Sequence, residues 1–179
     1  MGVPIAQPAE RRLVFTYGTL KRGFSNHRLV QELIRRGDAE FVGPYRTAER
    51  YPLVCGPYQV PFLLDFRGKG DCVRGELYAV SAAGIRHMDE LEGTSKGHYV
   101  RRSVVIMPEE GEEEGGEVKA EAYFAHSSYA ERLWQRRGMK GLSVYSPEET
   151  VGYVRRADRP QHLTFLQQID LFISVGGQA

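Results

Sequence analysis

Long hydrophobic runs are missing from this sequence, and cysteine is scarce. No apolar stretch approaches the roughly 20 residues of a membrane-spanning helix, so we expect no membrane partner. The segment MGVPIAQPAERR (1–12) lacks the apolar core of a secretory signal. The two cysteines, Cys55 and Cys72, lie in or beside apolar, strand-like stretches with no partner at metal-ligand spacing. We therefore expect free thiols in a reducing compartment and a cytoplasmic protein.

An excess of charge of either sign is also missing. The chain has 24 lysines and arginines against 23 acidic residues, and its arginine doublets are scattered along the sequence. A net charge of +1 creates no field that would attract nucleic acid or an anionic membrane. We expect a small-molecule ligand, no nucleic-acid partner and a monomer.

The common catalytic and metal-binding motifs are absent as well. The sequence contains no GxSxG, no GxxxxGK[ST] and no HExxH. Its 5 histidines are dispersed, and no two stand four positions apart as ligands on one helix face. The sequence therefore predicts neither a metal site nor a nucleotide cofactor.

What is present is a series of short strands with a few helices inserted among them. We expect strands at 13–17, 39–45, 51–54, 60–65, 73–80, 98–107 and 117–125. We expect helices at 27–36, 81–92, around 129–137 and in an amphipathic stretch to Ile173, with Asn26 capping the first and a capping box at 146–149. Since consecutive strands outnumber strand–helix alternations, the pattern favours an α+β fold with a mainly antiparallel, curved sheet. A length of 179 residues fits a single domain, 1–179.

The segment FTYGTLKRG (15–23) runs from a strand into a turn of small residues. A glycine directly after a strand allows successive backbone N–H groups to point towards one anion, so Gly18, Thr19 and Leu20 are candidate ligand-binding residues. Gly18 also permits a positive φ if the turn needs one. Tyr17 is a candidate wall of the pocket. The alternatives are an ordinary connection from strand to helix and a core tyrosine at a strand end.

The segment MDELEG (88–93) places one carboxylate on an apolar helix face. At 100° per residue Glu92 falls between Ile85 and Met88, whereas Glu90 points to the opposite side and Asp89 lies on the rim. A carboxylate in that position loses hydration, so its pKa rises and it can act as a base near neutral pH. The alternative is that Glu92 simply pairs with an arginine such as Arg101.

At this point the residues carry a resemblance. FTYGTLKRGFSNH (15–27) resembles the signature of the gamma-glutamylcyclotransferase-like superfamily, and particularly its gamma-glutamylamine cyclotransferase branch and plant avirulence-induced relatives. Further segments recur in the same order over a catalytic core of about 13–125: YPLV, VPFLLD, GELYAV, MDELEG and YVR. The resemblance implies a small β-barrel flanked by helices. The helical C-terminal extension at about 126–179 departs from the simplest family pattern, and its helices could cover the pocket mouth.

The resemblance also implies a reaction. Proteins of this family release 5-oxoproline from gamma-glutamyl compounds; their Tyr-Gly-x-Leu loop, here Tyr17–Leu20, holds the glutamyl group, and the glutamate at the position of Glu92 is the base. No metal or other cofactor is needed. We expect gamma-glutamylamines as substrates. The alternatives are glutathione or gamma-glutamyl amino acids, and a non-catalytic, defence-associated binding protein on the same fold.

Overall fold

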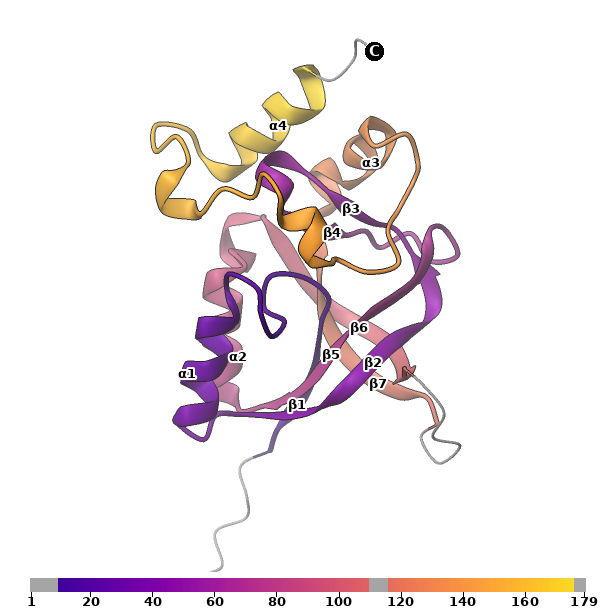
Figure 1. Cartoon of the computed structure of the whole chain (residues 1–179), viewed down its shortest axis with the longest axis vertical. Coiled ribbons are helices and arrows are strands. Elements are labelled where there is room, and N and C mark those ends of the chain that lie inside the picture. The colour runs from indigo at the N-terminus through magenta and orange to yellow at the C-terminus, as the bar shows by residue number, and fades with distance from the viewer. Residues whose placement is uncertain (1–9, 110–115, 176–179) are drawn as a thin grey trace, which may run out of the picture.

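The described residues build a strongly curved sheet that closes on itself. The computed structural model describes residues 10–109 and 116–175. Its strands are β1 Arg12–Thr16, β2 Ala39–Tyr51, β3 Leu53–Cys55, β4 Pro61–Leu63, β5 Asp71–Val80, β6 Tyr99–Pro108 and β7 Val118–Ala125. They are ordered β1-β5-β2-β6-β7-β4-β3, and an extra pairing of β1 with β7 closes the barrel (Figure 1).

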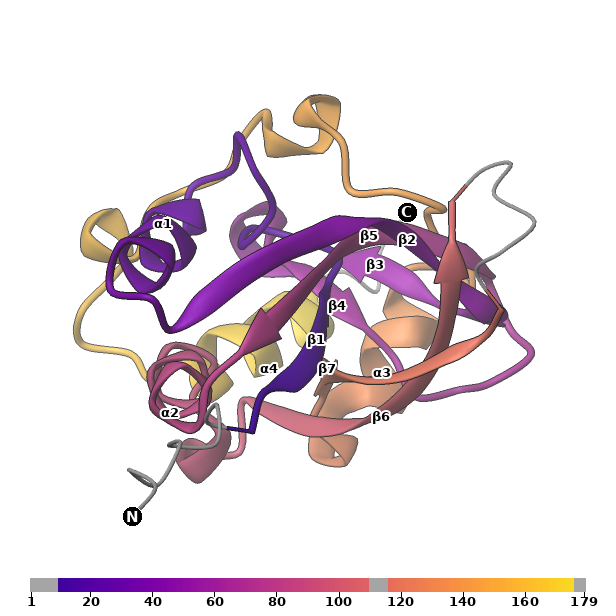
Figure 2. The ribbon, with the colours of Figure 1, turned by 90° about the horizontal axis from the view of Figure 1, so that it is seen from below.

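The pairings confirm the expected fold class. All neighbouring strands run antiparallel except β1 with β7 and β4 with β7, which are parallel. The β3–β4 hairpin therefore joins the barrel alongside β7 as an appendage, as the view from below makes clear (Figure 2). The result is the predicted α+β fold, a mainly antiparallel β-barrel with helices around it.

Helices cover two regions of the barrel surface. The helices are α1 His27–Arg35, α2 Ala82–Leu91, α3 Ser127–Arg136 and α4 Phe165–Val175. Helices α1 and α2 lie on one side, and α3 and α4 pack together beside the β3–β4 hairpin (Figure 1). None of the helices within the described ranges is both long and apolar enough to cross a membrane.

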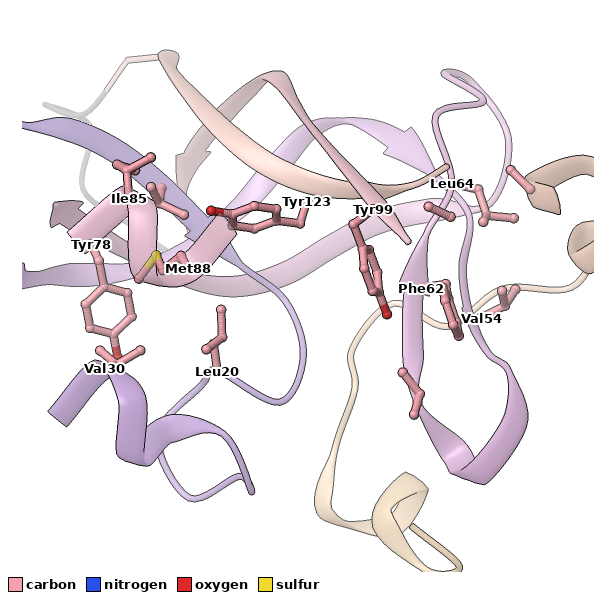
Figure 3. Close-up of a cluster of buried hydrophobic side chains, with 14 of the residues drawn as sticks. Leu20, Val30, Val54, Phe62, Leu64, Tyr78, Ile85, Met88, Tyr99 and Tyr123 are labelled. Atoms are coloured by element: carbon pink, nitrogen blue, oxygen red, sulfur yellow. The ribbon is translucent and has the colours of Figure 1, made fainter. Parts of the chain in front are cut away.

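Alternation along the strands separates two apolar cores. In β5, Val73 and Leu77 point into the barrel, whereas Tyr78 and Val80 point outward beneath α1 and α2. This division follows from the two-residue period of a strand. The outer cluster is continuous from Met88 of α2 to the β3–β4 hairpin, with Tyr123 between its two ends (Figure 3).

The structure corrects the predicted division of the chain at 39–54. Strand β2 runs without interruption from Ala39 to Tyr51, although Gly43-Pro44 favoured an end there. Register shifts at Phe41/Gly43 and Arg46/Arg50 absorb the irregularity. At the second register shift, between Arg46 and Arg50, the Thr47 hydroxyl accepts a hydrogen bond from the Val73 N–H at 2.8 Å. Most of the acidic segment 108–117, between β6 and β7, lies outside the described residues.

The helix caps agree only in part with those predicted from the sequence. Ser81 accepts a hydrogen bond from the Gly84 N–H at the start of α2, and Ser146 and Glu149 form the predicted capping box. Asn26 precedes α1 but makes no side-chain cap. Its side chain is used elsewhere, in the turn described below.

Gly75 leads to a stability prediction. A Cβ at this position would lie 2.1 Å from the Thr16 carbonyl oxygen, which cannot move without breaking the β1–β5 pairing. We expect Gly75→Ala to lower the free energy of unfolding by about 2–3 kcal/mol. Gly43→Ala in β2 is the matched control, because its Cβ would meet only Tyr45 at 3.6 Å. Urea unfolding measures the free energy of unfolding of both variants. Equal values would show that the Thr16 carbonyl does not exclude a side chain at position 75.

Candidate active site

A cavity of about 330 Å³ lies where the end of β1, the end of α2 and the C-terminal extension meet. All five residues singled out in the sequence line it: Tyr17, Gly18, Thr19, Leu20 and Glu92. The extension contributes residues between Tyr153 and Gln168 to the same wall. The structure thus brings the small-residue turn and the inward carboxylate to one space.

The turn after β1 is held by its carbonyl groups and leaves its N–H groups free. The Gly18 carbonyl accepts the Lys21 N–H at 3.0 Å, and the Thr19 carbonyl accepts the Asn26 N–H at 2.9 Å. The Asn26 side chain donates to the Thr19 hydroxyl at 2.8 Å, which explains why it does not cap α1. Within the described residues, the N–H groups of Gly18, Thr19 and Leu20 have no acceptor. An anionic group in the cavity can therefore accept from them.

Gly18 is required for a different reason from the one considered in the sequence. Its φ is not positive, so the left-handed conformation is not what selects glycine. A Cβ at this position would lie 2.5 Å from Cγ of Pro61, at the start of β4. The turn therefore packs directly on a proline ring that also lines the cavity, and any side chain at Gly18 would separate them.

Tyr17 belongs both to the barrel core and to the cavity wall. It is 6% exposed, packs in the inner apolar cluster and still lines the cavity. Its hydroxyl donates to the Tyr123 carbonyl at 2.6 Å. The two interpretations of this residue are thus compatible.

Glu92 ends helix α2 and faces the cavity. It is the C-cap residue, and Gly93 follows in the left-handed conformation with φ of 61°. A Cβ on Gly93 would strike the His98 ring at 2.3 Å, so glycine is required to turn the chain here. Asp89 is half-buried and Glu90 is exposed, as the helix phase predicted.

The hydroxyl groups around Glu92 are committed to other acceptors. Tyr99 donates to the Pro61 carbonyl at 3.1 Å, Tyr123 donates to Asp89 at 2.7 Å, and Tyr129 donates to the His98 carbonyl. These three tyrosines and Tyr17 all lie close enough to Glu92 to interact electrostatically with its charge. No residue in the described part of the chain donates a side-chain hydrogen bond to the Glu92 carboxylate.

Arg101 does not pair with Glu92. Its guanidinium forms an ion pair with Asp89 at 3.1 Å and a second with Glu121 at 3.3 Å. The ion-pair alternative considered for Glu92 is therefore wrong for this arginine. Asp89 binds both the Arg101 guanidinium and the Tyr123 hydroxyl, and neither group bonds to Glu92.

This environment raises the pKa of the Glu92 carboxyl from its ordinary value of 4.5 to about 7. The main cause is loss of hydration on burial, which disfavours the charged form. The Arg156 guanidinium, which also lines the cavity, acts in the opposite direction but more weakly. A carboxyl group with a pKa near 7 can both take and return a proton at neutral pH.

Residues 14–141 match the family model described as "Gamma-glutamyl cyclotransferase, AIG2-like". This chain belongs to that family. It is 54% identical over 183 residues to a protein of Arabidopsis thaliana named "putative gamma-glutamylcyclotransferase", across 97% of this chain and 98% of the relative. It is 35% identical over 146 residues to the gamma-glutamylaminecyclotransferase of Mus musculus, across 76% of this chain and 97% of that protein.

Solved structures of the family have the same fold. The crystal structure of an AIG2-like protein from Mus musculus aligns with a TM-score of 0.70 at 31% identity, covering 84% of this chain and 99% of that one. Membership of the family and the names of these relatives support a gamma-glutamylcyclotransferase activity for this chain.

Several cavity residues escaped the sequence analysis. They come from β6, β7 and the extension: Tyr99, Tyr123, Arg156, Arg159 and Gln168. A tyrosine in a strand is indistinguishable from core by its spacing, and an arginine in an irregular segment resembles solvated surface. Within residues 10–109 and 116–175, no three His, Cys, Asp or Glu side chains are grouped as metal ligands.

The contact of Gly18 with Pro61 leads to a prediction. Gly18→Ala should lower the free energy of unfolding by about 1–3 kcal/mol, because the proline ring cannot bend away. Pro61→Ala removes the nearest atom, so the double variant should recover part of that loss. The test is a double-mutant cycle by chemical denaturation, with an expected coupling of about 1 kcal/mol or more. Strictly additive losses would show that the two residues do not constrain each other.

The raised pKa of Glu92 leads to a second prediction. Because the folded state binds this proton more tightly than the unfolded state, ionisation of Glu92 costs stability as pH rises from 4.5 to about 7. Glu92→Gln removes that cost, so the variant should gain up to about 3 kcal/mol over the wild type at pH 8 and little at pH 5. Glu90→Gln, at an exposed position on the same helix, is the matched control. A constant difference between pH 5 and pH 8 would mean that Glu92 has an ordinary pKa.

Proposed function

We propose that this protein is a cyclotransferase that releases 5-oxoproline from gamma-glutamyl compounds, with Glu92 as the base. The observation that carries the proposal is that one cavity is lined both by a carboxyl group with a pKa of about 7 and by a turn whose three backbone N–H groups have no acceptor among the described residues. Gamma-glutamylamines are the proposed substrate class, which relatives named gamma-glutamylaminecyclotransferases support at 35–38% identity.

The reaction is an intramolecular transfer of the gamma-glutamyl group. The substrate's α-ammonium loses a proton to Glu92, and the amine nitrogen attacks the γ-carbonyl carbon. The new N–C bond closes a five-membered ring, and the bond from that carbon to the departing amine nitrogen breaks. The two protons lost by the attacking nitrogen equal the two gained by the leaving amine, and Glu92 passes them from one to the other. No oxidant, nucleotide or metal enters this balance.

The turn supplies the complementary charge stabilisation. The N–H groups of Gly18, Thr19 and Leu20 hold either the α-carboxylate of the substrate or the oxyanion that develops at the γ-carbonyl. The walls, including Tyr17, keep the short chain folded so that the amine lies against its own carbonyl. Holding the reacting groups together supplies much of the rate acceleration in such ring closures.

The proposed role of Glu92 predicts a specific loss of turnover. Glu92→Gln should reduce 5-oxoproline release by about 100-fold to 10,000-fold, because the amide cannot accept the proton. Wild-type activity should rise with pH through an apparent pKa of about 7, as Glu92 ionises. The measurement is 5-oxoproline release from a panel of gamma-glutamylamines, gamma-glutamyl amino acids and glutathione, with exposed Glu90→Gln as the matched control.

Binding of the product separates chemistry from folding. Glu92→Gln should still bind 5-oxoproline with near-normal affinity, since the turn that holds the ligand is unchanged. Near-normal turnover in a folded Glu92→Gln protein would remove this residue from the mechanism. A wild-type protein that releases no 5-oxoproline from any member of the panel would refute the proposed function.

A further inference from the structure

The Asn26 side chain bonds to the turn after β1 instead of capping a helix. Asn26 and Thr19 are half-buried, and both line the cavity. Asn26 stands at the N-cap position of α1, where an asparagine side chain usually accepts from a helix N–H and stabilises the helix. Here its Nδ2 donates to the Thr19 hydroxyl oxygen at 2.8 Å, and α1 has no side-chain cap. The capping interaction is replaced by a contact inside the cavity wall.

The start of α1 holds the turn by three hydrogen bonds. The Asn26 N–H donates to the Thr19 carbonyl at 2.9 Å, and the Asn26 side chain donates to the hydroxyl of the same residue. The Nδ1 atom of His27 lies 2.8 Å from the Leu20 carbonyl, and because a carbonyl only accepts, this nitrogen carries the hydrogen. The remaining carbonyl of the turn accepts the Lys21 N–H. The turn therefore has only donors left to offer a ligand.

The bond from Asn26 determines what the Thr19 hydroxyl can offer. A threonine hydroxyl has one proton to donate and two lone pairs that accept. Since the amide N–H of Asn26 bonds to the oxygen, the hydroxyl proton is left for another acceptor, and it has none among the described residues. The hydroxyl thus adds a fourth donor to the three free backbone N–H groups of the same turn.

The turn offers an anion neutral donors only, so the direction of each donor matters. Its two cations are used elsewhere: Lys21 donates to the Tyr145 carbonyl, and Arg22 forms an ion pair with Glu76 at 2.8 Å. A hydrogen bond to a charged acceptor is about twice as strong as one between neutral groups. A hydroxyl turned the other way would present a lone pair to the anion and repel it.

We propose that Asn26 is a positioning residue: by donating to the Thr19 hydroxyl, it directs the hydroxyl proton to the anionic oxygen of the substrate that the turn holds. This inference rests on the proposed function, in which that oxygen belongs to the α-carboxylate or to the oxyanion at the γ-carbonyl. It adds a side-chain donor to the site and a residue outside the Tyr17–Leu20 loop that controls it.

The test exchanges the Asn26 amide for a carboxylate of nearly the same shape. Asn26→Asp removes the N–H donor and supplies an acceptor, which draws the hydroxyl proton away from the ligand. The kcat/KM for a gamma-glutamylamine should fall about 10-fold to 100-fold, the range of a charge-assisted hydrogen bond. The free energy of unfolding should not fall, because a carboxylate is favoured at the N-terminus of a helix. Thr19→Val, which has no hydroxyl, should lose a similar factor, and Thr19→Ser should lose little.

Two controls separate the hydroxyl from the added charge. Ser25→Asp places the same charge at the neighbouring, exposed position and should cost little activity. In the Thr19→Val background there is no hydroxyl to turn, so Asn26→Asp should cost clearly less there than in the wild type. A double-mutant cycle measures this coupling. If Thr19→Val does not fold, Thr19→Ala takes its place in the cycle.

Binding of 5-oxoproline, measured by calorimetry, shows which oxygen the hydroxyl contacts. The product carries the α-carboxylate but no developing oxyanion. Parallel losses of 5-oxoproline affinity and of kcat/KM in Asn26→Asp and Thr19→Val support the inference and assign the turn to the carboxylate. Losses confined to kcat, with unchanged 5-oxoproline affinity, support it and assign the turn to the oxyanion.

The remaining outcomes overturn the inference. A folded Thr19→Val protein that binds 5-oxoproline and turns over like the wild type shows that the hydroxyl donates nothing to the ligand. An Asn26→Asp protein with wild-type activity, or with the same loss whether or not the hydroxyl is present, shows that Asn26 does not act through Thr19. These results leave the cyclotransferase proposal intact. A wild type that releases no 5-oxoproline from any gamma-glutamyl compound refutes that proposal, and one that also fails to bind 5-oxoproline refutes both.

Discussion

The candidate site depends on the Glu92 carboxylate, to which no side chain in the described part of the protein donates a hydrogen bond. A hydrogen bond or ion pair to Glu92 would favour its charged form and return its pKa towards the ordinary value. The four tyrosine hydroxyls near Glu92 and the Arg101 guanidinium all have other acceptors. Asp89, one turn earlier on the same helix, takes both the Arg101 guanidinium and the Tyr123 hydroxyl. Asp89 thus holds two groups, the Arg101 guanidinium and the Tyr123 hydroxyl, that could otherwise stabilise a charged Glu92.

The barrel closure determines where the opposing N–H groups lie. Strand β1 is paired on one side with β5, Phe15 opposite Leu77, and on the other with β7, Val14 opposite Glu121. A strand held on both edges cannot shift its register without moving its apolar residues to the wrong face. The turn that follows is then stopped by Pro61 of β4, against which Gly18 packs. Strand pairing on both edges of β1 and the Pro61 ring beyond it therefore fix the turn, which is the rigidity that a preorganised anion site requires.

Periodicity and local chemistry were enough to predict much of this arrangement. The helix phase distinguishes Glu92 from Glu90, because a regular helix carries its own geometry over a few residues. The same reasoning fails for Gly18, whose constraint is Pro61, a residue more than forty positions away that only the tertiary fold brings into contact. Arg159 was unpredictable for a related reason. Its burial results from aromatic rings of three separate segments, and a single arginine in the sequence shows none of them.

One buried lysine joins the turn after β1 to the C-terminal extension. Lys21, within the turn motif, is 7% exposed and donates from Nζ to the Tyr145 carbonyl at 2.6 Å. The Tyr145 hydroxyl in turn donates to the Gln59 carbonyl at 2.7 Å, at the tip of the β3–β4 hairpin. Burial lowers the pKa of Lys21, and the Tyr145 carbonyl oxygen accepts from its ammonium group without neutralising the charge, so the contact constrains direction more than a surface ion pair does. The Lys21–Tyr145 contact therefore fixes the turn after β1 against the C-terminal extension, and both segments line the candidate site.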